Sequence, residues 1–156
     1  MKLVLIATAT LVGLGVVVIV GGLIVARITM PGDDEVALGV VDGTLRPCPS
    51  TPNCVSTFAD DDTHRVEPIE TELSHEETVS RAQSALAALP RTTVVEERGG
   101  YLRGRSRSAI FGFVDDVEVY VPEGTSTIHF RSASRAGRGD MGVNRARYGS
   151  FRERLR

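Results

Sequence analysis

The sequence has few of the residues on which several common functions depend. Aromatic residues make up 5% of the 156 residues, and there is no Trp. Because single-stranded nucleic acids are held by bases that stack on aromatic rings, this composition argues against a nucleic-acid partner. The two cysteines and three histidines show no spacing typical of a zinc site. We therefore expect no nucleic acid, no metal and no cofactor.

Familiar catalytic and nucleotide-binding motifs are missing or incomplete. Ser106 lies in GRSRS and not in the G-x-S-x-G turn of a nucleophilic serine. Gly137, Gly139 and Gly142 have the spacing G-x-G-x-x-G. A dinucleotide site also needs a second strand and an acidic residue about 20 positions later, and the sequence stops at Arg156. We expect these glycines to allow positive φ in a tight turn between a strand and a helix.

Charge is absent from Leu3 to Ala26, a run of 24 residues that Lys2 and Arg27 flank. As a helix this run would reach about 36 Å, more than the roughly 30 Å hydrocarbon core of a bilayer. A cleaved signal peptide is the alternative, although its apolar region is shorter, about 7 to 15 residues. We expect residues 1–27 to form a single-pass anchor with its N-terminus inside, and the remainder to lie outside the cytosol.

The two halves of the remaining chain carry opposite charges. Residues 27–100 hold 14 acids and 6 arginines, a net charge of −8, whereas residues 101–156 hold 6 acids and 11 arginines, a net charge of +5. The forked guanidinium of Arg suits carboxylates and phosphates, so an anionic partner is one interpretation. Salt bridges to the acidic first half are the other. The start of the closing helix, near Arg135, Arg138 and Arg145, is a further place for an anion.

The domain organisation follows from composition. Gly, Pro and Asp are frequent after the apolar run, with no sustained hydrophobic period, which predicts a tether over residues 28–44. Residues 45–156 then form a single domain. Within it, Ser74 and Glu77 make a capping box that starts a helix, and Pro90 ends that helix. A closing helix is predicted from about Val143.

The sheet is predicted from alternating segments separated by turn residues. These segments are residues 92–98, 101–108, 113–121 and 126–134, with residues 64–70 as a candidate fifth strand. Runs of strands flanked by single helices are typical of the α+β class. We expect an antiparallel sheet of four to five strands with two packed helices, preceded by one N-terminal transmembrane helix.

Alternation along the strands predicts a polar face that carries most of the arginines. Across the last hairpin, Val119 should lie near Ile128 or Phe130, and Glu118 should meet His129 or Arg131. This face is either a solvated surface with weak cross-strand ion pairs or a binding surface for an anionic ligand. The predicted polar residues are Tyr101, Arg103, Arg105, Arg107, Asp116, Glu118, Tyr120, His129, Arg131 and Arg135.

Asp115 is the exception, because alternation places it on the apolar face. An unpaired buried carboxylate is costly, so we expect Asp115 to pair with an Arg, with Ser132 or Ser134, or with a backbone N–H. The alternative is a role as general acid or base. Cys48 and Cys54 enclose a short loop with two prolines, and they should form a disulfide if the domain is exported.

Three segments resemble the family called domain of unknown function 1499: CPSTPNCVST, IFGFVDDVEVYV and IHFRSASRAGRGDMGVNRARYGSFRERL. The resemblance covers about residues 45–156. It implies paired cysteines and often a membrane or export signal, and it implies no activity. A site shared with that family would include Cys48, Cys54, Asp115, Asp116, Glu118, Arg131, Ser132, Ser134, Arg135, Asp140, Asn144 and Arg145.

Three functions fit these observations. We expect a membrane-anchored extracytoplasmic binding or assembly module that holds an anionic ligand, a lipid head group or an envelope protein. Its candidate ligand-binding residues are Arg131, Ser132, Ser134, Arg135, Asp140, Asn144 and Arg145. The alternative is a hydrolase-like enzyme with Asp115 or Asp116 as acid or base beside Arg131 and Arg145. A purely structural envelope protein is the third.

Overall fold

The computed structural model describes the backbone of residues 2–28 and 30–156, and the side chains of residues 10–22, 24, 25, 30–33 and 35–156. The chain divides into two compact units, Met1–Met30 and Pro31–Arg156. The first unit contains helix α1 (Lys2–Ile28). Over the part of the chain that is described, no helix meets both the length and the hydropathy of a membrane span.

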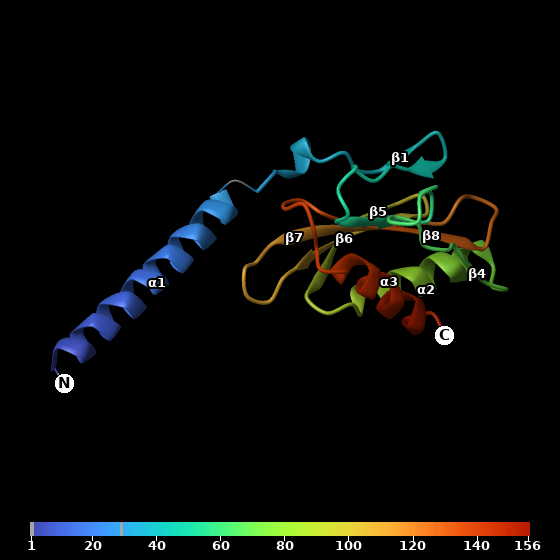
Figure 1. Cartoon of the computed structure of the whole chain (residues 1–156). Coiled ribbons are helices and arrows are strands. Elements are labelled where there is room, and N and C mark those ends of the chain that lie inside the picture. The colour runs from blue at the N-terminus through green and yellow to red at the C-terminus, as the bar shows by residue number, and fades with distance from the viewer. Residues whose placement is uncertain (1, 29) are drawn as a thin grey trace. The chain divides into compact units, whose positions relative to one another are not determined.

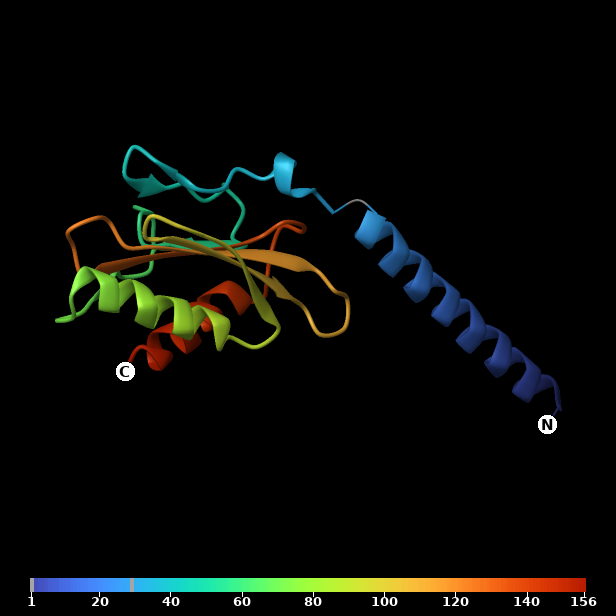
Figure 2. The same ribbon diagram turned by 180° about the vertical axis from the view of Figure 1, so that it is seen from behind.

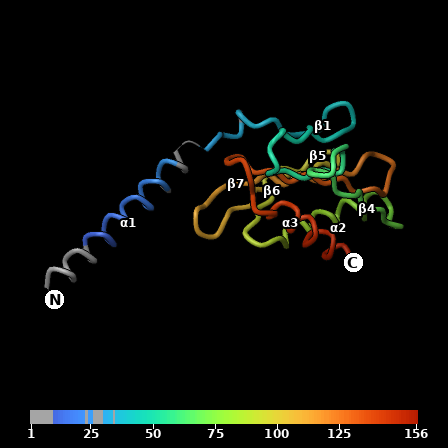
Figure 3. The backbone as a smooth tube through the Cα atoms, viewed as in Figure 1, coloured from blue at the N-terminus to red at the C-terminus, as the bar shows by residue number. Residues whose placement is uncertain are grey.

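The second unit is an α+β domain, as the sequence predicts, and Figure 3 shows the path of its backbone. Its main sheet is antiparallel with strand order β3-β8-β7-β6-β5, and β4 also pairs with β8. Strands β1 and β2 form a separate hairpin. The elements are η1 (Asp33–Glu35), β1 (Val40–Val41), β2 (Thr44–Leu45), β3 (Cys54–Ser56), β4 (Ile69–Glu70), α2 (His75–Ala87), β5 (Thr92–Arg98), β6 (Tyr101–Arg107), β7 (Val114–Tyr120), β8 (Thr127–Ser134) and α3 (Val143–Arg154).

The strand count differs from the prediction of four to five, because the sheet has six strands. The four long strands β5 to β8 lie where alternation predicts them. Of the candidate fifth strand, Ile69–Glu70 pairs with β8, and Arg65 forms an isolated bridge with Ser56. Strand β3 was not predicted, since its three residues, Cys54–Ser56, are too few to show a period.

Helices α2 and α3 cover one face of this sheet (Figures 1 and 2). The predicted capping box starts α2: Ser74 Oγ accepts from Glu77 N at 3.3 Å, and Ser74 N donates to Glu77 Oε2 at 3.0 Å. Leu86 of α2 is fully buried against the sheet. From α3, the ring of Phe151 lies 5.1 Å from that of Phe130 in β8. The hydrophobic core therefore lies between the sheet and these two helices.

The opposite face of the sheet is covered by residues 31–47, which we call the covering segment (Figures 1 and 2). We predicted residues 28–44 as a tether, and three residues of that range, Pro31, Asp33 and Gly39, form hydrogen bonds with side chains of the domain. Gly39 N donates to Glu118 Oε1 at 2.7 Å, and the Pro31 carbonyl accepts from Arg135 Nη1 at 3.1 Å. Leu45 is 2% exposed. Hydrogen bonds to charged side chains of the sheet hold a segment that has no hydrophobic period of its own.

Candidate functional site

The arginines of the sheet gather on the face that the covering segment hides. The predicted register across the last hairpin is confirmed, with Val119 opposite Phe130 and Glu118 opposite Arg131. We call the polar side, together with Asp33 of η1, the arginine face. Its residues are Asp33, Glu96, Tyr101, Arg103, Arg105, Asp116, Glu118, Arg131 and Arg135.

Most side chains of the arginine face are buried, so the interpretation as a solvated surface is wrong for them, whereas Arg105, Asp33 and Glu96 are 31%, 36% and 37% exposed. The side chains of Arg131, Arg135 and Arg103 are 4%, 6% and 11% exposed, and that of Asp116 is 1% exposed. Weak, screened surface ion pairs do not describe such groups. Each buried charge instead needs a partner of opposite charge and nearly complete hydrogen bonding.

Glu118 lies at the centre of the face and is fully buried. Its Oε2 accepts from Arg131 Nη1 at 2.6 Å, and its Oε1 accepts from Tyr101 Oη at 2.9 Å. The Gly39 amide completes its partners from the covering segment. Burial and the negative charge of Glu118 raise the pKa of Tyr101, which keeps the phenol protonated as a donor. This carboxylate therefore holds β6, β8 and the covering segment together.

Asp116 orients the guanidinium of Arg135. Arg135 Nε donates to Asp116 Oδ2 at 2.7 Å, and Arg135 Nη2 donates to Asp116 Oδ1 at 2.8 Å. Arg103 Nη1 lies 3.5 Å from the same carboxylate, and Arg103 Nε donates to Glu96 Oε2 at 3.3 Å. Two arginines are thereby fixed by carboxylates of the sheet itself, with further N–H groups left for another acceptor.

That acceptor is the carboxylate of Asp33. Its Oδ1 accepts from Arg135 Nη2 at 2.8 Å, its Oδ2 accepts from Arg105 Nη2, and Arg103 Nη2 lies 3.7 Å from Oδ2. Three arginines of the sheet thus converge on one carboxylate that the covering segment supplies. Apart from Asp33, the arginine face contains four arginines but only three carboxylates. The arginines are Arg103, Arg105, Arg131 and Arg135, and the carboxylates are those of Glu96, Asp116 and Glu118. Asp33 neutralises the remaining positive charge.

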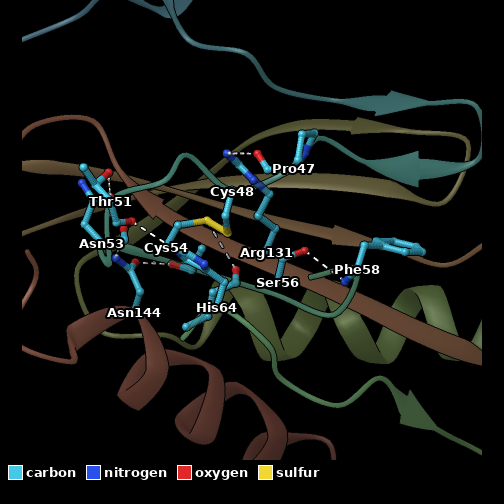
Figure 4. The surroundings of a disulfide bond; sticks show 12 residues. Pro47, Cys48, Thr51, Asn53, Cys54, Ser56, Phe58, His64, Arg131 and Asn144 are labelled. Atoms are coloured by element: carbon cyan, nitrogen blue, oxygen red, sulfur yellow. Dashed lines mark hydrogen bonds between the residues drawn. A yellow bond between two sulfur atoms is a disulfide. The ribbon is translucent and has the colours of Figure 1, made fainter. Parts of the chain in front are cut away.

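A cavity of about 420 Å³ borders this site. Its wall includes Arg131 and Arg135 on the sheet, Pro47 and Cys48 beside them, and Val36 of the covering segment. The predicted disulfide between Cys48 and Cys54 is confirmed. Figure 4 shows Arg131 next to this disulfide, where its Nη2 donates to the Pro47 carbonyl at 3.4 Å. In the part of the chain that is described, Arg131 Nε is buried without a hydrogen-bond partner.

Four other predicted site residues bond to α3 or lie within it on the helix side of the sheet: Asp115, Ser132, Ser134 and Asn144. Asp115 is confirmed there as a paired acid, because its Oδ2 accepts from Arg147 Nη2 at 2.6 Å. Arg147 Nη1 also donates to Ser132 Oγ at 2.9 Å. Sequence reasoning missed Arg147, although its position three residues after Asn144 on a predicted helix places both on one helical face.

Asn144 joins the start of α3 to the sheet. It accepts from Ser132 Oγ at 2.6 Å, and its Nδ2 donates to Ser134 Oγ at 3.0 Å and to the Asn53 carbonyl at 2.9 Å. Asp140 accepts from the backbone N–H groups of Gly142, at 3.0 Å, and Asn144, at 2.7 Å. The first N–H groups of α3, where the sequence suggested an anion, are therefore occupied by the chain's own carboxylate.

The structure brings together only some of the residues that the sequence predicts to share a site. Asp115 and Asp116 lie on opposite faces of the sheet, where Asp115 pairs with Arg147 and Asp116 with Arg135, while Arg131 pairs with Glu118 and with neither aspartate. Arg145 lies at neither face, because its guanidinium donates to the carbonyls of Thr63 and Arg65, at 2.8 and 2.9 Å. Gly137 and Gly142 take the positive φ values expected of a tight turn, 86° and 78°.

A metal site requires several ligating side chains close together. Among the described side chains, no group of three or more His, Cys, Asp or Glu residues is placed to hold a metal ion. On the arginine face, guanidinium groups instead bind carboxylates of the chain itself, and guanidinium groups in general donate in pairs to carboxylates and phosphates.

Comparisons with known proteins agree with the motifs in the sequence. Neither the curated proteins nor the solved structures include a match to this chain. The model of one family, described as "Protein of unknown function (DUF1499)", matches residues 44–155, which include every strand of the main sheet and both packed helices. The chain therefore belongs to the DUF1499 family.

Proposed function

We propose that this protein is a membrane-anchored binding module, with its domain outside the cytosol, whose arginine face binds an anionic group of a ligand or partner. The anion, a carboxylate or a phosphate, takes the place that Asp33 occupies. The observation that carries this proposal is the convergence of Arg103, Arg105 and Arg135 on the Asp33 carboxylate. Arg103 and Arg105 belong to the long strand β6 and Arg135 directly follows β8, whereas Asp33 belongs to a three-residue helix.

The contrast in burial favours Asp33 as the exchangeable part. The Asp33 side chain is 36% exposed, but those of Arg135 and Arg103 are 6% and 11% exposed. Asp116 and Glu96 also bind these two guanidinium groups, so we expect the groups to keep their orientation when Asp33 is displaced. A site whose donors are already oriented binds an oxyanion with little loss of side-chain entropy.

The neighbouring cavity supplies room for the rest of a ligand. Its volume of about 420 Å³ falls within the range of about 300–1,000 Å³ typical of small-molecule sites. Arg131 and Arg135 both line it, so a ligand there can reach the charged groups that bind Asp33. The cavity walls Val36 and Pro47 are apolar, as is common where a few polar groups fix the orientation of a ligand.

Two features support the proposed location. The uncharged run from Leu3 to Ala26 lies within the 27-residue helix α1 and has the length of a bilayer span. The disulfide between Cys48 and Cys54 is typical of compartments outside the cytosol. In right-side-out membrane vesicles, added protease should degrade the C-terminal domain, and protection of that domain would contradict the proposed topology.

The anion site is tested by removing the internal carboxylate. We expect the full-length Asp33→Ala variant, in detergent micelles, to bind inorganic phosphate at least tenfold more tightly than the wild type in calorimetric titrations. A matched control is Glu123→Ala, which removes an exposed carboxylate from the turn between β7 and β8 and should leave the affinity unchanged. Acetate in place of phosphate separates carboxylate from phosphate selectivity. Equal affinities for Asp33→Ala and the wild type would contradict the proposal.

A second candidate function is hydrolase-like chemistry on the helix side. A cavity of about 350 Å³ lined by Asp115, Arg147 and Ser106 is the observation that favours it. Asp115 would act on a substrate that Arg147 binds. If the wild type shows turnover in a broad hydrolase and transferase screen, that turnover should disappear in Asp115→Asn while the fold persists. If the wild type shows no turnover, the hydrolase candidate is contradicted and the binding function is the one that remains.

A further inference from the structure

We propose that the domain docks onto the lipid surface through two loops, residues 108–113 and 136–142, at one end of the sheet. This inference rests on the membrane anchoring in the proposed function. The loops expose large apolar side chains: Ile110 is 80% exposed, Phe111 45%, and Met141 104%. Outside α1, six large apolar residues are exposed among the described side chains, and four of them, these three and Val143, lie in or beside the two loops. Apolar exposure is thus concentrated at one place.

The two loops leave the sheet side by side. Asp115, near the start of β7, pairs with Ser134 at the end of β8, and Arg135 N donates to the Val114 carbonyl at 3.0 Å. Ala109 and Val143 line the same cavity on the helix side. Figures 1 and 2 show both loops at the same end of the sheet, opposite the β1–β2 hairpin.

The chain enters the domain at this same end. The Pro31 carbonyl accepts a hydrogen bond from Arg135, which directly follows β8. Five peptide units separate Ala26, at the end of the uncharged run, from Pro31, and a fully extended chain of that length spans about 18 Å at most. When the run is inserted in a bilayer, this short connection limits how far Pro31 can lie from the lipid surface.

The conformation and charge of the loops suit an interfacial position. Met141 has φ 54°, which non-glycine residues rarely adopt, and the turn that contains it directs the side chain to solvent. Arg107 and Arg138 are exposed beside the apolar residues. Apolar side chains that enter the acyl boundary, flanked by arginines at the level of anionic head groups, are the usual composition of a membrane-surface site.

The absence of Trp from the wild-type chain allows a direct test. Phe111→Trp and Met141→Trp place single reporters in the two loops, and Val41→Trp places a control in the β1–β2 hairpin. Val41 is 41% exposed and Phe111 45%, so the control matches in exposure. The full-length variants are reconstituted in vesicles of phosphatidylcholine and phosphatidylglycerol with brominated acyl chains. We expect bromine to quench both loop reporters at least twofold more than the control.

The outcomes separate docking from anchoring. Quenching of the loop reporters no greater than that of Val41→Trp, in protein that floats with the vesicles, would overturn the docking proposal and leave the anchor in place. Protein that does not float with vesicles would overturn both. Blue-shifted loop reporters that bromine does not quench would show that a second copy covers the loops, which also overturns docking on lipid. Ile110→Asp in the Phe111→Trp chain should reduce quenching without preventing flotation.

Discussion

Arg135 and Asp116 form a two-bond ion pair, with Nε to Oδ2 at 2.7 Å and Nη2 to Oδ1 at 2.8 Å, and both side chains are almost completely buried. This pair turns the guanidinium of Arg135 toward the covering segment, where it also binds the Asp33 carboxylate and the Pro31 carbonyl. One residue thereby links β7, the end of β8 and the segment that follows α1.

Replacing Arg135 should destabilise the domain strongly. Arg135→Gln leaves Asp116, which is 1% exposed, with a buried negative charge that only Arg103 opposes, at 3.5 Å. Loss of one partner of a buried ion pair costs about 3–5 kcal/mol. Urea denaturation should show this decrease in the free energy of unfolding, whereas Arg138→Gln, at an exposed position, should stay within about 0.5 kcal/mol of the wild type. Similar stabilities for the two variants would contradict the buried network.

The Glu118–Arg131 pair should be strongly coupled. Glu118→Gln removes the charge opposite Arg131 while keeping the shape of the side chain, and we expect a loss of about 3 kcal/mol. The double variant Glu118→Gln with Arg131→Met should lose less than the sum of the single variants, because neither charge is then left unpaired. A double-mutant cycle from chemical denaturation measures the difference. Additive losses would show that the pair does not interact.

Reduction of the disulfide should lower stability by a modest amount. The Cys48–Cys54 bridge closes a short loop, with a sequence separation of 6, and short loops restrict the unfolded chain less than long ones. Loop-closure entropy then predicts about 2 kcal/mol. Thermal unfolding of Cys48→Ser with Cys54→Ser, compared with the oxidised wild type, measures this value. The double variant should still fold, since the hydrophobic core lies on the other face of the sheet.

Stability should decrease as the pH rises through the titration of His64. Burial acts to lower the pKa of His64, but hydrogen bonds to Asp61, at 2.8 Å, and to the Thr51 carbonyl, at 3.1 Å, outweigh it and raise the pKa above 6.5. Because the folded pKa is higher than the unfolded pKa, this stabilisation is complete below about pH 6.5 and is lost as the pH passes the folded value.

The measurement compares unfolding free energies of the wild type and His64→Gln between about pH 5.5 and 8.5 around the ordinary His pKa. The advantage of the wild type should shrink with rising pH. His129→Gln is a control for which the advantage of the wild type should grow with rising pH. Burial lowers the pKa of His129, so the folded state favours its neutral form. If the difference in unfolding free energy between the wild type and His64→Gln does not depend on pH, the raised pKa of His64 is contradicted.

The long elements of this fold are predictable from the sequence because each shows a local signal. Alternation defines β7 and β8 and narrows the partner of Glu118 to His129 or Arg131, of which Arg131 is the one observed, and the capping box at Ser74 defines α2. The covering segment has no such signal. Its place depends on contacts distant in the sequence, such as that of Asp33 with Arg135, which are 102 residues apart.

The candidate site was less predictable, for a reason of geometry. Arg131 and Ser132 are neighbours in the family motif, but successive side chains in a strand point to opposite faces. Arg131 therefore joins the arginine face, while Ser132 bonds to Asn144 on the helix side. A motif that is continuous in the sequence is divided here between an ionic network and the packing of α3.

The central claim is that a bound anion and the Asp33 carboxylate compete for the same arginines. Carbon-13 NMR of the Asp33 carboxylate, in full-length protein labelled at Asp, observes this competition directly, with Asp33→Ala providing the assignment. Titration with inorganic phosphate should move the Asp33 resonance toward that of a solvated carboxylate, and Arg135→Gln should abolish the phosphate dependence. An Asp33 resonance that stays unchanged while phosphate binds would contradict the account.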